Sequence, residues 1–259
     1  MLLQPQLDGR ILVATLNRPA AGNAINAAVA SELQALATRM ERTPAIEAVI
    51  LAGKGRIFCG GGDIGSFRTA LEAGTGTEAF TELLADLSLQ VHAALDRIVQ
   101  AGPLLVAAVH GPAAGAGVGL VCACDYAFAR RGATLHAGFS RLGISPDTGL
   151  TYFLPRIVGY RKALDVLVGG EAVDAETART LGIYSQLIDV GDEQFLDHVI
   201  AATEKLIAPG KAVRETRRLL QLSEQSRLNT QLEHERNSLV GLSRDVHVVA
   251  HIRRTLGLK

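Results

Sequence analysis

The feature that most constrains this chain is a long stretch, residues 101–121, without a single Asp, Glu, Lys or Arg. A stretch of this length and composition must leave water, either in a bilayer or inside a folded core. Pro112 and three nearby glycines interrupt it, and they argue against a membrane span. Residues 104–111, LLVAAVHG, are typical of a buried strand, and 115–125, GAGVGLVCACD, predict a helix of small residues buried on every side.

The rest of the chain alternates between strand-like and helix-like segments. The predicted strands are 10–19, 48–53, the short segment 55–63 that runs into glycines, and 126–130. The predicted helices are 26–40, 160–170 and 174–182, and residues 67–100 are a polar, helix-prone stretch. This alternation predicts an α/β fold. The last part of the 259-residue chain is helical and charged, so we predict a core domain at 1–195 and a C-terminal helical region at 196–259.

Composition excludes several classes of function. The chain has 26 Lys and Arg residues and 26 Asp and Glu residues, so it has no net positive charge that would favour the binding of nucleic acid. Three cysteines, an odd number, and the absence of an apolar leader at the start predict a reducing, cytoplasmic setting. No cysteine or histidine spacing indicates a metal site. We therefore expect no nucleic acid, membrane or metal partner.

Two glycine-rich loops each follow an apolar segment. The first glycine loop is Gly60–Asp63, and the second is Gly115–Gly119, which enters the small-residue helix. Neither has the spacing of a phosphate loop, and tight turning alone explains either one. Together they offer backbone N–H groups that a ligand can approach closely. One N–H from each loop would form an oxyanion hole for a thioester enolate.

The segment GISPDTGLTYFLPR, residues 143–156, places an acid at the start of an apolar helix. Ser145 is the predicted N-cap, Pro146 the first helical residue, and Asp147 follows. Asp147 in that first turn would either stabilise the helix dipole or do chemistry. The helix end would lower its pKa, whereas apolar neighbours such as Phe139 would raise it.

Blocks across most of the chain resemble the enoyl-CoA hydratase/isomerase (crotonase) superfamily. They are LNRPAAGNAIN, GRIFCGGGDI, VAAVHGPAAGAGVGLVCACDYAFA, LGISPDTGLTYFLPRIVGYRKALDVL and DAETARTLGIYSQLID. The resemblance implies a spiral of ββα turns, a C-terminal helical region for assembly as a homotrimer or hexamer, and an acyl-CoA thioester substrate. Coenzyme A would be part of the substrate, and no separate cofactor is implied.

The resemblance also assigns binding roles. The N–H groups of Gly62 and Ala116 would hold the thioester oxygen. The residues implied for the CoA path are Gly60, Asp63 and Ile64, with Ala20 and Gly22 near the nucleotide end.

The chain departs from the hydratase pattern at both catalytic glutamates, where it has Gly119 and Phe139. Hydration needs a positioned water and a proton donor, which paired carboxylates supply. What remains is Asp147, in a block most similar to the phenylacetate-pathway epoxyacyl-CoA isomerase and also similar to dienoyl-CoA isomerases. The sequence therefore favours an isomerase in which Asp147 removes a proton from one carbon and returns it to another. Phe139 would line the acyl pocket.

Three alternatives remain open. The chain also resembles the chlorobenzoyl-CoA dehalogenase branch, which implies Asp147 as nucleophile and His92 as base, although the tryptophans of that branch are absent. An incidental role for His92 is as good an interpretation. A hydratase that relies on Asp147 alone and a non-catalytic acyl-CoA-binding homologue are the other two.

Overall fold

A computed structural model describes residues 3–73, 77–223 and 225–255. They divide into two compact units, Met1–Lys205 and Leu206–Lys259. The predicted domain boundary at 195/196 lies inside helix α8, Asp192–Ile207. Within the described residues, no helix has the length and apolar character needed to cross a bilayer.

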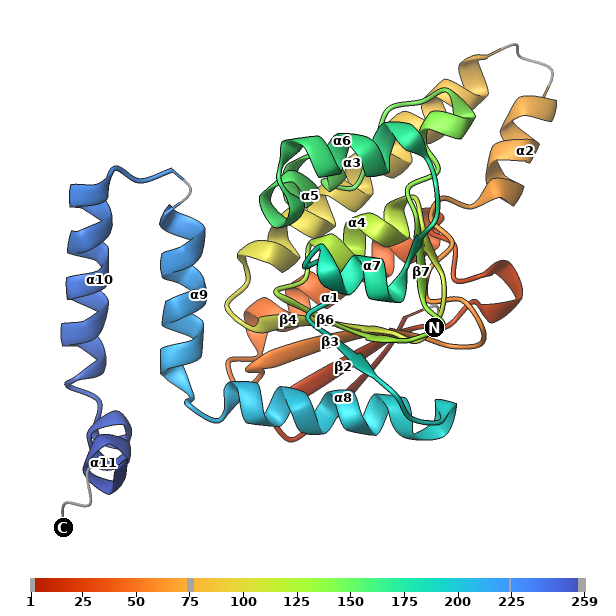
Figure 1. Cartoon of the computed structure of the whole chain (residues 1–259). Helices are drawn as coiled ribbons and strands as arrows, with labels where there is room; N and C mark the ends of the chain where they lie inside the picture. Colours follow the sequence, from red (N-terminus) through yellow and green to blue (C-terminus); the bar gives the residue numbers. More distant parts are fainter. Residues whose placement is uncertain (1–2, 74–76, 224, 256–259) are drawn as a thin grey trace. The chain divides into compact units, whose positions relative to one another are not determined.

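The first unit is built on a six-stranded sheet in the order β1-β2-β3-β4-β6-β9, in which only β1 and β2 pair antiparallel (Figure 1). Its strands are β1 (Leu3–Asp8), β2 (Ile11–Leu16), β3 (Ala48–Gly53), β4 (Leu104–Val109), β6 (Tyr126–Arg130) and β9 (Gln186–Ile188). A smaller sheet contains β5 (Ala113–Ala114), β7 (Thr134–His136) and β8 (Val173–Asp174). The predicted α/β class is confirmed.

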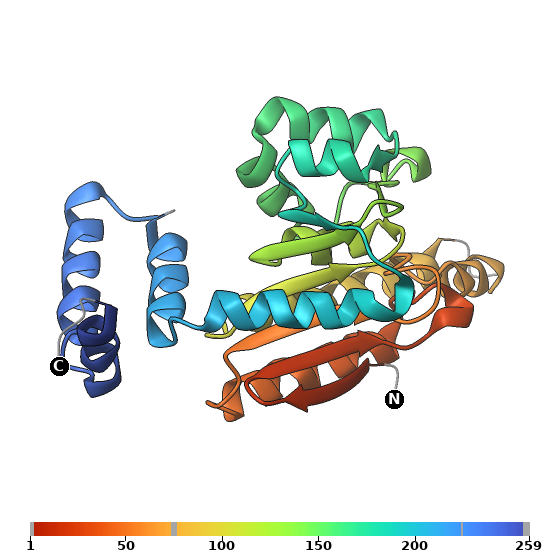
Figure 2. The ribbon, with the colours of Figure 1, turned by 60° about the horizontal axis from the view of Figure 1, so that its bottom comes forward.

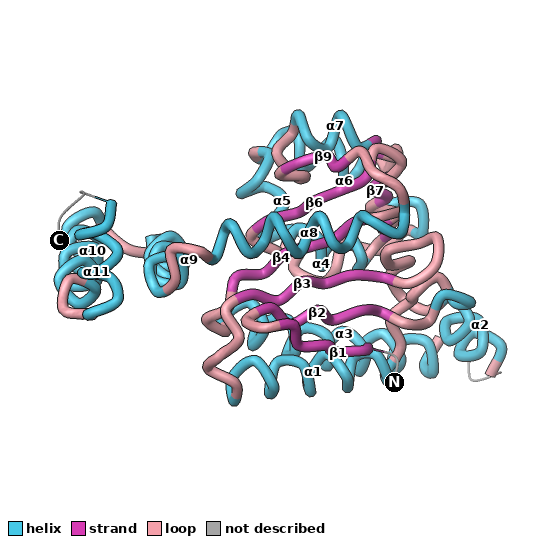
Figure 3. Tube along the Cα trace, turned by 90° about the horizontal axis from the view of Figure 1, so that it is seen from below, coloured by secondary structure: helices cyan, strands magenta, loops and turns pink. Residues whose placement is uncertain are grey.

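Helices cover both faces of the larger sheet. The helices of the first unit are η1 (Pro19–Ala21), α1 (Ala27–Arg42), α2 (Ile64–Glu72), α3 (Glu78–Gln100), α4 (Ala116–Cys122), η2 (Ser140–Leu142), α5 (Leu150–Val158), α6 (Tyr160–Gly169) and α7 (Ala175–Thr180), followed by α8. Figures 1 and 3 show α8 across one face, with α1 and α3 on the other. Figure 2 shows α5, α6 and α7 gathered at the β6/β9 edge, opposite β1 and β2. Every residue of β4 is buried, as expected of a strand covered on both faces.

The second unit contains α9 (Lys211–Ser223), α10 (Leu228–Leu242) and α11 (Val246–Thr255). These helices agree with the predicted helical C-terminal region. Many of their apolar side chains are exposed in the single chain, among them Leu220, Leu228 and Leu239.

The predicted helices at 26–40 and 174–182 are confirmed as α1 and α7. Asn26 caps α1 by accepting a hydrogen bond from the N–H of Val29, and Asp174 caps α7 in the same way. The uncharged stretch folds as β4, a turn, and α4, whose residues 117–122 are all buried.

The helix-prone stretch 67–100 folds as two helices, α2 and α3. One local prediction in this part of the chain is wrong. Residues 55–63 form no strand, because Cys59 makes only a single bridge with Ala113 before the glycines turn the chain. The backbone conformation of Gly61, with φ of +85°, is incompatible with a continuing strand.

Candidate active site

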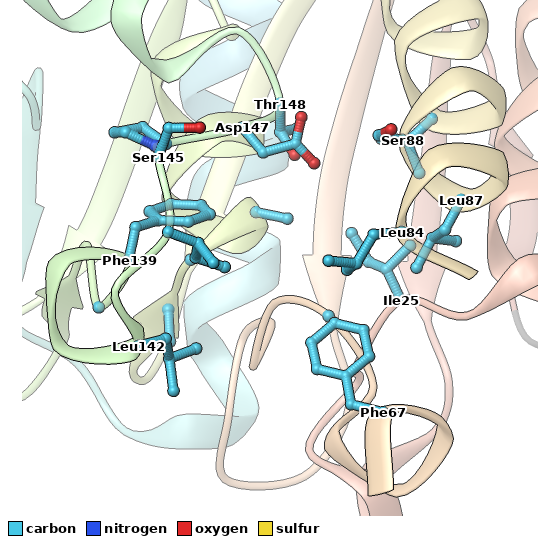
Figure 4. A pocket seen from close by; sticks show the side chains of 18 of the residues that line it. Ile25, Phe67, Leu84, Leu87, Ser88, Phe139, Leu142, Ser145, Asp147 and Thr148 are labelled. Carbon is cyan, nitrogen blue, oxygen red and sulfur yellow. The ribbon is translucent and has the colours of Figure 1, made fainter. Parts of the chain in front are cut away.

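A cavity of about 630 Å³ lies in the first unit, where the two glycine loops, α2, α3 and the segment before α5 meet. Figure 4 shows two groups of side chains facing each other across it, Phe139, Leu142, Ser145, Asp147 and Thr148 on one side and Ile25, Phe67, Leu84, Leu87 and Ser88 on the other. Most of these side chains are apolar. Among the described residues that line the cavity, Asp147 is the only carboxylate.

The first glycine loop is tied to the chain around Gly22 and Ile25. The N–H of Gly60 donates to the carbonyl of Gly22 at 2.8 Å, and the N–H of Ile25 donates to the carbonyl of Gly61 at 2.7 Å. Gly62 lies opposite Ile25 in an isolated bridge, so its own N–H points away from that partner. This fixed backbone directs the N–H of Gly62 elsewhere, and Gly62 lines the cavity.

The second glycine loop packs directly against the first. The N–H of Ala114 donates to the carbonyl of Cys59 at 2.8 Å, and the N–H of Gly115 donates to the main-chain carbonyl of His136 at 2.9 Å. A Cβ on Gly61 would lie 2.7 Å from the carbonyl oxygen of Ala114, so only glycine permits this approach.

Ala116, the first residue of α4, also lines the cavity. Within the described part of the chain, the N–H groups of Ala116 and Gly62 have no backbone or side-chain acceptor. The structure thus brings the two predicted donors to one cavity with both N–H groups free.

The environment of Asp147 differs from the prediction. Helix α5 begins at Leu150 with Gly149 as its N-cap, and no side chain caps it. The predicted helix start at Ser145 and Pro146 is therefore wrong. Thr148 and Gly149 both have positive φ, +56° and +68°, which an α-helix does not allow. Helix capping does not explain Asp147, whose carboxylate instead faces the cavity (Figure 4).

His92 and Asp147 are in contact. Leu84, Ser88 and His92 follow one another at four-residue spacing and so share one face of α3, which lines the cavity. The Nε2 atom of His92 contacts the Oδ1 atom of Asp147. The two candidates, far apart in sequence, thus form a pair at the cavity.

The positions of the two missing glutamates are filled. A Cβ on Gly119 would lie 2.6 Å from the carbonyl oxygen of Thr148, so no side chain fits there without a backbone shift. Phe139 is 8% exposed and lines the cavity with its ring, as predicted. The packing therefore leaves no room for a carboxylate at position 119, and at position 139 an apolar ring lines the cavity instead.

The predicted CoA-path residues divide into two groups. Gly60 and Ile64 line the cavity, whereas Ala20, Gly22 and Asp63 do not. The carboxylate of Asp63 caps α2 and pairs with Arg18 at 2.8 Å. Burial raises the pKa of Asp63, but the hydrogen bonds from Arg18 and Ser66 outweigh it, and the net pKa is lowered.

Sequence reasoning missed Thr148. It is fully buried and lines the cavity, and its Oγ1 has no hydrogen-bond partner in the described structure. A β-branched residue at positive φ is strained by about 1–3 kcal/mol. The Asp-Thr-Gly order indicates a turn but does not place left-handed backbone on the threonine.

Among the described residues, no cluster of three His, Cys, Asp or Glu side chains could hold a metal ion.

The chain is similar to known proteins over most of its length. Residues 7–249 match the family model described as enoyl-CoA hydratase/isomerase. A probable enoyl-CoA hydratase of Mycobacterium tuberculosis is 33% identical over 81% of this chain and 75% of its own length. The 1,2-epoxyphenylacetyl-CoA isomerase of Escherichia coli is 30% identical over 91% of this chain and 88% of its own. A 4-chlorobenzoyl coenzyme A dehalogenase of an Arthrobacter species is 30% identical over 70% and 65%.

The fold is shared with solved structures. An enoyl-CoA hydratase from Polaromonas superposes with a TM-score of 0.88 at 26% identity, covering 98% of this chain and 96% of the other. The predicted crotonase-type fold is confirmed.

Proposed function

The chain belongs to the enoyl-CoA hydratase/isomerase family, and from that premise we propose that it is an acyl-CoA isomerase that uses Asp147 as its proton shuttle. The observation that carries the proposal is one carboxylate in an apolar cavity that also contains two free backbone N–H groups, those of Gly62 and Ala116. These are the groups that a proton shift next to a thioester requires.

The proposed reaction has two proton transfers. Asp147 removes a proton from a carbon of the acyl group, and the electron pair of that C–H bond moves through the carbon chain onto the thioester oxygen. The N–H groups of Gly62 and Ala116 donate to this enolate oxygen. The electron pair then returns to form a C–H bond at a different carbon with the proton held by Asp147. The product has the mass of the substrate, and the carboxylate is regenerated.

Hydration is disfavoured by what surrounds Asp147. A hydratase mechanism with paired carboxylates needs a second acid at the cavity, and Gly119 and Phe139 exclude one at the two expected positions. His92, in contact with Asp147, orients the carboxylate during both transfers.

The proposal extends to the ligand and the assembly. The substrate is an acyl-CoA thioester without a separate cofactor, with Gly60 and Ile64 beside the thioester and Asp63, Ala20 and Gly22 further along the CoA path. We propose a cytoplasmic homotrimer or hexamer. The exposed apolar side chains of α9, α10 and α11 support assembly, and light scattering on the purified protein measures it.

The test is a panel of 3-enoyl, 2-enoyl and halobenzoyl CoA esters, followed by mass spectrometry and thioester absorbance. Isomerisation gives unchanged mass and new conjugation from the 3-enoyl ester. Asp147→Asn lowers this kcat about 1,000-fold, because the shuttle is lost. Asp96→Asn, an exposed carboxylate on α3 outside the cavity, is the matched control and keeps wild-type turnover.

Other outcomes would overturn the isomerase. A gain of one water indicates hydration, and tight binding of every ester without turnover indicates a binding protein. Full activity in Asp147→Asn would remove Asp147 from the mechanism.

A second candidate reaction is favoured by the contact between His92 and Asp147. Asp147 attacks a halogen-bearing ring carbon, halide leaves with its bonding electrons, and an aryl ester of Asp147 forms. His92 then takes a proton from water, and the resulting hydroxide cleaves the ester at its carbonyl carbon. Two results would establish this reaction in place of the isomerase. One is release of halide, and the other is ¹⁸O from labelled water that appears first in the Asp147 carboxylate and then in the product.

A further inference from the structure

Two unusual features, the missing side chain of Gly119 and the left-handed backbone of Thr148, meet at the residue that follows Asp147. Gly119, in the middle of α4, has no Cβ where Thr148 packs against it. A Cβ at that position would lie 2.6 Å from the carbonyl oxygen, 2.8 Å from the Cβ and 3.0 Å from the Cγ2 of Thr148. Real Cβ atoms do not make contacts below 3.0 Å. Thr148 therefore rests directly on the bare backbone of α4.

Thr148 has an unfavourable conformation at this contact. Its φ is +56°, a rare value for a β-branched residue, and its hydroxyl is buried without a partner in the described residues. Such features persist only where the surrounding structure imposes them, and they concentrate at functional sites. The contact with Gly119 is what holds Thr148 in place.

We propose that Gly119 and Thr148 are positioning residues that hold the carboxylate of Asp147 in the cavity. This inference rests on the proposed role of Asp147. The left-handed backbone at Thr148 and Gly149 turns the chain sharply between Asp147 and α5, and the N–H of Leu150 donates to the carbonyl of Asp147 at 3.1 Å. With Thr148 fixed against α4, the direction of the Asp147 side chain is fixed as well.

The contact also determines what a side chain at position 119 would do in this backbone. A side chain at position 119 meets the main-chain oxygen of Thr148, which cannot rotate away as a side chain does. Any residue larger than glycine therefore displaces the backbone that carries Asp147. In this chain, a side chain at position 119 does not fit together with Asp147 at its present place.

Three variants separate the contact from the hydroxyl. Gly119→Ala introduces the clash, and Thr148→Gly removes the side chain that touches α4 while relaxing the backbone. Thr148→Val keeps the branched shape and removes only the hydroxyl. Gly132→Ala is the matched control, because a Cβ on Gly132 meets nothing within 4 Å. With trans-3-hexenoyl-CoA as the probe, we expect kcat to fall about 100-fold in Gly119→Ala and about 10-fold in Thr148→Gly. KM stays within about 3-fold in both. Gly132→Ala retains wild-type kcat, and Thr148→Val loses less activity than Thr148→Gly.

A second readout needs no turnover. The ¹⁵N resonance of His92 Nε2 in the full-length protein reports where Asp147 lies, because the two side chains are in contact. His92→Gln assigns the signal. We expect the resonance to move in Gly119→Ala and Thr148→Gly and to stay in place in Thr148→Val. Circular dichroism checks folding, and the two Thr148 variants decide the question if Gly119→Ala does not fold.

Distinct results overturn the two proposals. The positioning role alone is refuted if Asp147→Asn loses activity while Gly119→Ala and Thr148→Gly keep normal kcat and an unmoved His92 signal. Equal losses in Thr148→Val and Thr148→Gly assign the effect to the hydroxyl and also refute it. Full activity in Asp147→Asn refutes the proposed function, whereas the His92 resonance still tests whether the contact positions Asp147.

Discussion

The two glycine loops and the segment that carries Asp147 face the same cavity but are held by different interactions. Backbone hydrogen bonds tie the loops to distant parts of the chain, such as Gly60 to Gly22 and Gly115 to His136. In the segment from 139 to 147, the backbone hydrogen bonds are local, for example Gly143 to Ser140 and Ile144 to Phe139. Immediately after it, Thr148 packs directly against Gly119 of α4, the contact that we propose to position Asp147.

This difference separates two parts of the chemistry. In the proposed mechanism the loops provide donors from the backbone, which persist as long as the fold does and suit any reaction that passes through a thioester enolate. In the same mechanism the Asp147 segment provides the side chains that determine which reaction takes place. The relatives named hydratase, isomerase and dehalogenase share the fold, and we expect them to differ mainly in side chains such as these.

The largest expected effect tests the loops. Ala116→Pro removes one N–H at the first position of α4, where a helix tolerates proline. We expect kcat to fall about 100-fold to 1,000-fold, because one oxyanion donor is lost. Steady-state kinetics on the 3-enoyl ester measures it. Ala27→Pro, at the first position of α1, is the control. Normal turnover in Ala116→Pro would mean that the second loop only shapes the cavity.

A smaller effect tests the other side of the comparison. His92→Gln keeps a polar side chain on α3 but removes the imidazole that contacts Asp147. For an isomerase we expect kcat to fall about 10-fold, because Asp147 is less well oriented. Rapid-quench analysis with halobenzoyl-CoA would instead show an accumulated Asp147 ester if His92 were the base of a dehalogenase.

The anchoring of the first loop predicts a pH effect on stability. The folded-state pKa of Asp63 is lowered, because hydrogen bonds from Arg18 and Ser66 outweigh the effect of burial. Its contribution to stability is therefore complete above the unfolded value of 3.8 and is lost as pH falls through the lower folded value.

Asp63→Asn tests this contribution. We expect it to lower the free energy of unfolding by about 1–2 kcal/mol at pH 7, because the charge-assisted bond to Arg18 is lost. Urea titrations should also show that the free energy of unfolding of Asp63→Asn falls less steeply below pH 4 than that of the wild type. An unchanged acid decline would mean that other carboxylates dominate it.

The smallest effect concerns a thiol beneath the loops. Cys59 is fully buried between them, and burial raises the pKa of its thiol to about 11. We expect no labelling of Cys59 by a thiol reagent at pH 8 in the native protein and complete labelling in denaturant, as mass spectrometry would show. Cys124, which is partly exposed, is the internal comparison. Labelling of native Cys59 would show that the loops open.

Much of the architecture was predictable, because it depends on local patterns. The uncharged stretch predicted β4 and α4, and the apolar spacing of α1 predicted its buried face, Val29, Leu33, Leu36 and Met40. The glycine loops could be located because close backbone approach requires glycine there. The missing glutamates were visible in the resemblance to the family.

The details around Asp147 were not predictable in the same way. Ser-Pro-Asp followed by apolar residues has the local features of a helix start, yet the helix begins only at Leu150. The packing of Thr148 against Gly119 overrides that local preference and imposes left-handed backbone.

The sequence by itself therefore determined the sheet, the helices that cover it and the two loops with their N–H groups, since these follow from hydrophobic periodicity and from the freedom of glycine. Only the tertiary structure decided that His92 meets Asp147 across 55 positions of the chain and that Thr148 fills the space beside Gly119. The physical reason is that such contacts depend on how separate elements pack against one another. A local sequence pattern carries no information about the shape of the distant segment that a residue will contact.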